Sequence, residues 1–157
     1  MVAVIASLYF FWCAYDPSEW HLIDGVNLAV HEAGHLIFSL FGEFMMIAGG
    51  SLFQVIMPAL FVGYFCYRRQ FYSAALVLFW VGESILNVSV YAADSVALQL
   101  PLLGGQDSVH DWNYLLSSLN LLSWTTQIAG VIRLLGTFLI ATAALGSVWF
   151  ARRDRED

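Results

Sequence analysis

Long apolar stretches without charge constrain the fold of this chain more than any other feature of its sequence. Only 11% of the 157 residues are charged, whereas 60% are hydrophobic. Soluble domains carry about 25% charged and about 45–50% apolar residues, so this chain lacks the polar surface that a soluble enzyme needs. At about 20 residues per membrane-crossing helix, the chain has room for roughly four or five crossings. We therefore predict an all-α, multi-pass integral membrane bundle that forms one transmembrane domain over residues 1–157.

Prolines, glycine pairs and charged residues divide the chain into helical segments. We predict helices over residues 1–15, 24–41, 51–67 and 71–100, an interfacial or re-entrant helix over 113–131, and a final span over 134–151. The segment 113–131 is assigned to the interface because Ser, Asn, Thr and Trp are mixed with its leucines. The first segment reaches only about 22 Å, against a hydrocarbon core of about 30 Å, so we leave open whether it crosses fully.

The arginines predict which helix ends share a membrane face. A pair at 68–69 and a group within 152–155 contain five of the six arginines, and there is no lysine. Helix alternation places both clusters at one face and places loop 101–112, with the end of helix 24–41, at the opposite face. Because positive charge favours the cytoplasmic side, we predict that the C-terminus is cytoplasmic. A net charge of −6 without a basic stripe excludes nucleic acid as a partner.

The predicted helix 24–41 carries the pattern His31-Glu32-Ala33-Gly34-His35. Residues four apart share a helix face, so both imidazoles can bind one Zn²⁺ while Glu32 reaches a water that the metal activates. Ionisable side chains are costly within a membrane helix, which favours a functional role for all three. The pattern therefore predicts a zinc site with Glu32 as the general base of a hydrolytic reaction. The alternative is a pair of core histidines bonded to polar neighbours, with Glu32 in an ion pair.

This motif resembles that of the membrane-embedded zinc metalloproteases of the site-2-protease type, whose active helix carries His-Glu-x-x-His within the bilayer. The resemblance covers residues 31–35 and, more loosely, the hydrophobic architecture with a distal polar motif. It implies hydrolysis of peptide bonds in or near the membrane, with His31 and His35 as ligands and Glu32 as base. In that family an Asp from a later Asn-Pro…Leu-Asp-Gly segment supplies the third ligand, and this chain has no such segment.

A zinc hydrolase needs a third protein ligand and one open position for water. We expect His110 to be that ligand, because loop 104–112 lies at the face toward which the motif helix runs and imidazole is a preferred neutral zinc donor. Asp111 and Asp94 are the alternates, and Asp111 could instead orient an imidazole. The alternative for this loop is a solvated turn that Trp112 anchors at the interface.

The predicted helix 71–100 carries a polar stripe at helical spacing. Its members are Glu83, Asn87, Tyr91 and Asp94. Such a stripe on a membrane helix must face the bundle interior or a water-filled cavity. We expect these side chains, together with Asp111, Asn27 and Gln54, to support the metal ligands or to bind substrate. The alternative is an interhelical hydrogen-bond network that only holds the bundle together.

These patterns predict an intramembrane zinc metalloprotease, a single transmembrane catalytic domain that cleaves membrane-spanning or membrane-adjacent proteins or peptides. Two alternatives stay open. One is a zinc-dependent membrane hydrolase of a lipid-linked amide or ester, because the same activated water attacks any such carbonyl. The other is a metal-binding membrane scaffold without enzymatic activity. The sequence predicts neither the substrate nor an oligomeric state.

Overall fold

The computed structural model describes residues 1–100 and 109–153, and these form helices and turns without a β-strand. The all-α prediction is therefore confirmed. The elements in chain order are α1 (Val2–Tyr15), α2 (Leu22–Phe38), the 3-10 turn η1 (Ser39–Phe41), α3 (Glu43–Tyr67), α4 (Phe71–Ala93), α5 (Asp111–Ser118), the 3-10 turn η3 (Leu122–Trp124) and α6 (Thr125–Arg153). The first part of the predicted loop 101–112, and Arg155, lie outside the described residues.

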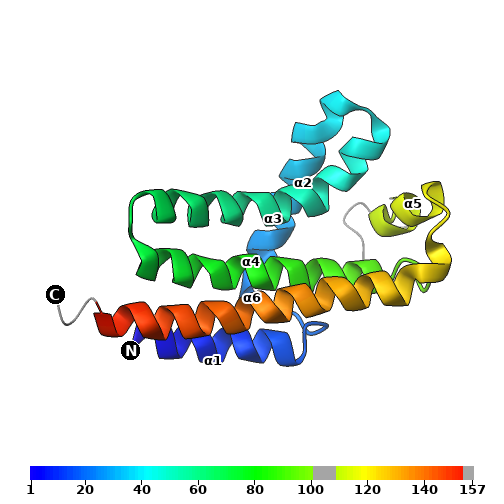
Figure 1. Ribbon diagram of the computed structural model, residues 1–157. Coiled ribbons are helices and arrows are strands. Elements are labelled where there is room, and N and C mark those ends of the chain that lie inside the picture. The colour runs from blue at the N-terminus through cyan, green and yellow to red at the C-terminus, as the bar shows by residue number, and fades with distance from the viewer. Residues whose placement is uncertain (101–108, 154–157) are drawn as a thin grey trace.

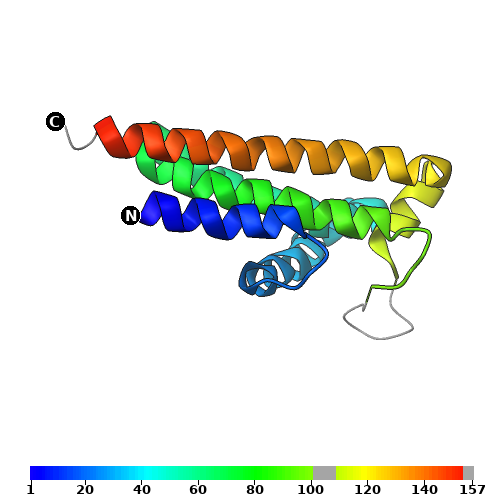
Figure 2. The same cartoon turned by 90° about the horizontal axis from the view of Figure 1, so that it is seen from below.

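Four helices form the bundle and one crosses it. Figure 1 shows α4 and α6 lying antiparallel along each other, with α1 on one side and most of α3 on the other. In contrast, α2 runs steeply across these helices, and Figure 2 shows it nearly end-on when they are seen from below. Helix α2 packs against α3. Its central residues lie toward one end of the bundle (Figure 1). That end holds the α1–α2 connection and α5 (Figure 1).

Three helical segments are long and apolar enough to cross a membrane: α3, α4 and the combined η3–α6 segment Leu122–Arg153. The shorter α1 and α2, with 14 and 17 residues, complete the bundle. Arg68 and Arg69 lie in the α3–α4 turn, at the same end of the bundle as the C-terminal end of α6 (Figure 1). The two arginine clusters thus share one end, and the assignment of that end to the cytoplasm stays a prediction.

Three predicted helix boundaries were wrong, one because of packing between helices and two because of local turns. Helix α3 begins at Glu43 rather than at residue 51, because its Gly49-Gly50 pair packs against α2 instead of ending the helix. Helix α4 ends at Ala93 rather than at residue 100, because the Asp94 carboxylate accepts the backbone N–H groups of Gln99 and Leu100, both at 2.9 Å, and folds the chain into a turn.

The third wrong boundary concerns the segment 113–131, which is not one interfacial helix. Its first residues belong to the eight-residue α5, and the remainder begins α6 at Thr125, so the final helix starts nine residues before the predicted span 134–151. Between them, Asn120 adopts a left-handed backbone conformation with φ of 57°, which ends the helical path. The 29 residues of α6 therefore form a continuous helix through Arg133.

Small residues bring α4 and α6 into backbone contact. A Cβ atom added to Gly136 would stand 2.8 Å from the carbonyl oxygen of Gly82, and one added to Gly82 would stand 2.8 Å from Ile140. Such close approach is how helices associate in lipid, where burial of apolar surface gives no advantage. Phe79, Leu86, Ile140 and Ala143 form the buried core around this crossing. This packing fixes the helix that carries the polar stripe.

Candidate metal centre

The two motif histidines lie together on one face of α2, as their spacing predicts. One potential ligand atom from each of His31, Glu32 and His35 lies within 4.8 Å of those from the other two. The two imidazole rings meet edge to face, with their centroids 4.7 Å apart. His31 is buried, His35 is partly buried, and Glu32 is exposed. The helix thus presents two metal-binding side chains inward and one carboxylate at the edge of the same group.

Glycines on α3 make room for these rings. A Cβ atom at Gly50 would stand 2.6 Å from Nε2 of His31 and 2.7 Å from Cε1 of His35. A Cβ atom at Gly34 would collide with the carbonyl oxygen of Gly49, so the backbones of α2 and α3 touch beside the rings. No side chain fits at either contact without displacing its neighbour. The glycine pair of α3, which sequence reasoning treated as a break, therefore positions the histidines.

Asp111, the first residue of α5, contacts both histidines. Its Oδ2 atom lies 2.9 Å from Nε2 of His31 and 3.3 Å from Nε2 of His35. Donor atoms bound to a tetrahedral zinc ion at about 2.0–2.1 Å stand about 3.3 Å from one another. The two distances from Asp111 are therefore close to the separation of two ligands on one zinc ion, although Asp111 lies 80 positions after His31 in the sequence.

The Asp111 carboxyl is held in its ionised form. Its burial alone would raise the pKa of this group, but when His31 and His35 are protonated, their hydrogen bonds and charges outweigh that effect and lower the pKa below its ordinary value. An ionised carboxylate offers only acceptor lone pairs. It is therefore available either to accept protons from the histidines or to bind a cation beside them.

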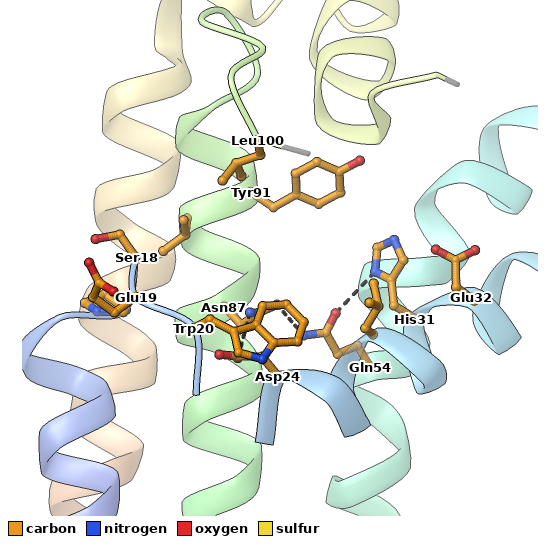
Figure 3. Close-up of a pocket in the computed structure, with 13 residues that line it drawn as sticks. Ser18, Glu19, Trp20, Asp24, His31, Glu32, Gln54, Asn87, Tyr91 and Leu100 are labelled. Carbon is orange, nitrogen blue, oxygen red and sulfur yellow. Dashed lines mark hydrogen bonds between the residues drawn. The ribbon is translucent and has the colours of Figure 1, made fainter. Parts of the chain in front are cut away.

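A hydrogen-bond relay fixes which nitrogen of His31 faces Asp111. The Asp24 carboxylate accepts the amide N–H of Asn87 at 3.0 Å, Oδ1 of Asn87 accepts the amide N–H of Gln54 at 2.8 Å, and Oε1 of Gln54 lies 3.2 Å from Nδ1 of His31 (Figure 3). Because a carboxylate can only accept, the direction of every later bond follows from the first. Nδ1 of His31 must therefore carry the proton and donate it to Gln54.

The second imidazole is oriented in the same way by the backbone. Nδ1 of His35 lies 2.9 Å from the carbonyl oxygen of Met46, which can only accept a hydrogen bond. Both rings thus carry their proton on Nδ1 and turn Nε2 toward Asp111. Metal-binding histidines characteristically donate their other ring N–H to a carbonyl or carboxylate, which fixes the tautomer and orients the ring.

His110, the expected third ligand, does not lie against the histidine pair. Its Nε2 atom is 3.2 Å from Asp94, and its Nδ1 atom accepts the backbone N–H of Asn113 as the N-cap of α5. The Tyr91 ring contacts both His110 and His31, with centroid distances of 4.5 and 5.8 Å. The structure thus brings Asp111, an alternate of the sequence analysis, to the pair in place of His110, because capping turns the His110 ring back onto its own helix.

The other predicted residues divide between two groups. Asn87 and Gln54 belong to the relay, and the Tyr91 hydroxyl accepts the backbone N–H of Asp111 at 3.3 Å. Asp94 bonds His110 and two backbone N–H groups rather than the histidine pair. The remaining two residues, Asn27 and Glu83, form a second buried group, whose Glu83 carboxyl lies beside Asp24 of the relay.

This second group joins α2 to α4 one turn or more away from the histidines. The Asn27 amide donates to Glu83, while its oxygen accepts hydrogen bonds from Trp80 at 2.8 Å and from Ser84 at 3.2 Å. Sequence analysis did not identify Trp80 or Ser84. Both flank Glu83 on α4. Following the polar stripe toward the start of that helix could have identified them.

A cavity of about 330 Å³ lies beside His31 and Glu32. It is lined by the α1–α2 connection, α2, α3, α4 and the turn after α4, through Pro17, Ser18, Glu19, Trp20, Asp24, Leu28, His31, Glu32, Gln54, Asn87, Val90, Tyr91 and Leu100. Figure 3 shows His31 and Glu32 on one side of this group and Ser18 and Glu19 on the other. The histidine group therefore borders a cavity of about 330 Å³.

The position of this site along α4 places it near one membrane surface. Asn87 and Tyr91, which contact the site, lie 16 and 20 residues after Phe71, or about 24 and 30 Å along the helix. The hydrocarbon core is about 30 Å thick, so we expect the site close to the membrane face opposite the arginine clusters where α4 crosses the bilayer from Phe71. No protein-family model, curated protein or solved structure matches this chain. The interpretation of the site rests on its own geometry.

Proposed function

We propose that this chain is a zinc-dependent membrane peptidase in which His31, His35 and Asp111 bind the metal and Glu32 is the general base. The observation that carries the proposal is the convergence of three acceptors. Both Nε2 atoms face one Asp111 oxygen, while both Nδ1 atoms donate to fixed carbonyl oxygens. Two neutral imidazoles and a carboxylate would oppose lone pairs at that point, and a divalent cation satisfies all three.

Protonation is the competing explanation. A proton on Nε2 of one ring, which the hydrogen bond to Asp111 favours at His35, donates to Asp111 without any metal, and the zinc content of the purified protein distinguishes the two states. Protonation of both rings is electrostatically poorer. It would place two positive charges on rings whose centroids are 4.7 Å apart, with Asp111 as their shared counter-ion. Like charges at such separation in a partly buried site disfavour the charged state of each ring. Metal binding needs no such repulsion, because each neutral ring contributes one lone pair.

Glu32 occupies the position of a base beside the ligands. It belongs to the same local group of potential ligand atoms, it is exposed, and it lines the cavity. A bound Zn²⁺ would supply Lewis acidity there, activating water and polarising the carbonyl under attack. The Glu32 carboxylate accepts a proton from the attacking water and delivers it to the leaving amine as the C–N bond breaks. Water is thus added across the amide bond without any other reactant.

The cavity and its depth favour a peptide at the membrane surface as substrate. The apolar side chains of Leu28, Val90 and Leu100 line the space, while the Asn87 and Gln54 amides give it a polar side. An extended peptide presents both apolar side chains and hydrogen-bonding backbone groups, and it matches such a lining. A site near the end of the membrane-spanning helices is suited to a segment that leaves the bilayer.

The decisive experiment separates metal binding from hydrolysis. Wild-type protein and Glu32→Gln are purified in detergent, loaded with zinc and assayed by metal analysis and by mass spectrometry of a peptide library. We expect both proteins to bind one zinc ion, and we expect Glu32→Gln to lose at least 100-fold in peptide hydrolysis, because it cannot accept the proton. Equal hydrolysis by the two proteins would contradict the proposal.

A matched control and a second substrate class complete this test. Glu43→Gln removes an exposed carboxylate at the start of α3, outside the cavity, and we expect it to keep full activity. A long-chain N-acyl amide tests the lipid-linked alternative. Hydrolysis of that amide alone, with all peptides intact, would show that the protein is a lipid amidase and not a peptidase. Zinc binding without hydrolysis of either class would leave a metal-binding scaffold.

A further inference from the structure

The cavity beside the metal-binding group is acidic. Among its lining residues are the carboxylates of Glu19, Asp24 and Glu32, and none is an arginine. The chain contains no lysine that could neutralise them. The one basic side chain in the lining is His31, which is occupied by Gln54 and Asp111. A substrate group with negative charge is therefore disfavoured in this space, and a group with positive charge is favoured.

The three carboxylates differ in what they already bind. Asp24 accepts the backbone N–H of His21 at 2.6 Å and the Asn87 amide at 3.0 Å, so both of its oxygens are used. Glu32 lies beside the histidines as the proposed base. The Glu19 carboxylate, in contrast, has no hydrogen bond or ion pair with the described residues, and its side chain is exposed in the α1–α2 connection. Glu19 is thus the carboxylate that is free to bind an incoming cation.

Apolar side chains lie between Glu19 and the metal-binding group. Trp20, Leu28, Val90 and Leu100 line the cavity, and Figure 3 shows Trp20 and Leu100 between the Glu19 side and the His31 side. A long side chain with an aliphatic stem and a charged end can bury its stem against such residues while its head reaches water. Among protein side chains, only lysine and arginine combine an aliphatic stem with a positive end.

We infer that this cavity binds a lysine or arginine side chain of the substrate, with Glu19 as its counter-ion. The inference rests on the proposed peptidase function and adds the substrate class to it. The acceptor Glu19 lies on the opposite side of the cavity from Glu32 (Figure 3), so a basic side chain bound there extends across the cavity from the carbonyl that is cleaved. The same charge pattern disfavours phosphate-bearing lipid head groups as substrates.

A charge-swap experiment tests this inference. Zinc-loaded protein in detergent micelles is given a set of apolar peptides that each carry one Lys, Gln or Glu at successive positions, and kcat/KM is measured for every cleavage product. We expect wild-type protein to prefer Lys over Glu about tenfold at one position relative to the scissile bond. Glu19→Gln should reduce that preference about three- to fivefold, and Glu19→Arg should invert it.

Two controls make the result specific to Glu19. Glu43→Gln should leave the Lys preference unchanged, because Glu43 lies outside the cavity. Raising the salt concentration should weaken the preference of wild-type protein and should affect Glu19→Gln less, since screening acts on the ion pair. Cleavage of the Gln peptides should be similar in wild-type protein and Glu19→Gln, which shows that the variant is folded and active.

The outcomes separate this inference from the proposed function. If wild-type protein cleaves Lys, Gln and Glu peptides equally, the basic-residue pocket is refuted while the peptidase stands. A preference for Lys that persists in both Glu19 variants also refutes the role of Glu19. If no peptide is cleaved by zinc-loaded protein, the peptidase itself is refuted, and the pocket with it.

Discussion

Two buried polar groups join α2 to its neighbours, and they are built differently. In the group around Asn27, every donor meets an acceptor: the amide donates to Glu83, and its oxygen accepts from Trp80 and Ser84. In the group around the histidines, two ring nitrogens converge on one carboxylate oxygen, and either a proton on a ring or a cation must lie between them. The donors of the first group all have acceptors, whereas we propose that a cation completes the second.

The difference indicates how a structural polar group can be distinguished from a metal-binding one in an apolar bundle. Both groups are buried, both cross between helices, and both contain a carboxylate. Burial and residue type alone therefore do not distinguish them. The direction of each hydrogen bond does, because a chain that begins at the carboxylate of Asp24 leaves Nε2 of His31 as an acceptor. The following variants test whether the two groups differ in zinc binding, in decreasing order of expected effect.

The largest effect is expected from the third ligand. Asp111→Ala removes the carboxylate that both histidines face, and we expect zinc affinity to fall at least 100-fold, because two of three protein ligands remain. His110→Ala should keep zinc affinity within about threefold, while the lost N-cap lowers stability by about 0.5–2 kcal/mol. Competition with a chromophoric chelator measures the affinities, and thermal unfolding measures the stability. Loss of zinc in His110→Ala with retention in Asp111→Ala would reverse the assignment.

A smaller but still large effect is expected at Gly50. The Cβ atom of Gly50→Ala would stand 2.6 Å from Nε2 of His31, and the ring cannot swing away without losing its bond to Gln54. We expect zinc affinity to fall by about tenfold to 100-fold, because displacement of a ligand by a fraction of an ångström disrupts the geometry. Gly63→Ala is the matched control on the same helix, since a Cβ atom there meets nothing within 4 Å. Equal zinc affinity in both variants would mean that the rings are not fixed.

The relay gives the third effect. Asn87→Leu removes the amide between Asp24 and Gln54, so the direction of the Gln54 amide, and with it the His31 tautomer, is no longer fixed. Loss of such an orienting partner typically costs about 10–100-fold in metal affinity. Asn87→Gln keeps the amide and should recover part of the affinity. Measurement of zinc affinity across pH adds a readout that mere destabilisation would not change, because a free tautomer alters the competition between protons and metal.

The sequence predicted those parts of the site that depend on local periodicity. The grouping of His31, Glu32 and His35 follows from helical spacing alone, and the structure has it. The choice between His110 and Asp111 depended on the residue at which α5 begins. A difference of one position decides which side chain caps the helix and which one faces α2. Helix boundaries are the least certain part of any sequence-based assignment, so this choice was not available from the sequence.

Tertiary packing overrode the local signals elsewhere. Gly49 and Gly50 indicated a break, but they are helical because the α2 backbone and the histidine rings take the space of their missing side chains. Asp94 was predicted within a helix, but its carboxylate caps the turn that follows α4. The glycine contact joins residues whose proximity depends on the fold, whereas the Asp94 contacts are local, to residues five and six positions later. The polar stripe was correctly predicted to face inward, and its division into two groups depended on the steep course of α2 across α4 (Figure 1).

The smallest effect on the metal is expected from the group around Asn27, which is the reference for the others. Asn27→Ala leaves Glu83, Trp80 and Ser84 without their shared partner, and unpaired buried polar groups cost about 1–3 kcal/mol each. We expect a lower Tm with zinc affinity within about twofold of wild type. Asn87→Leu should show the opposite pattern, with the larger change in zinc affinity. If Asn27→Ala instead lost zinc as strongly as Asn87→Leu, the two groups would be one network, and the direction of hydrogen bonds would not separate packing from metal binding.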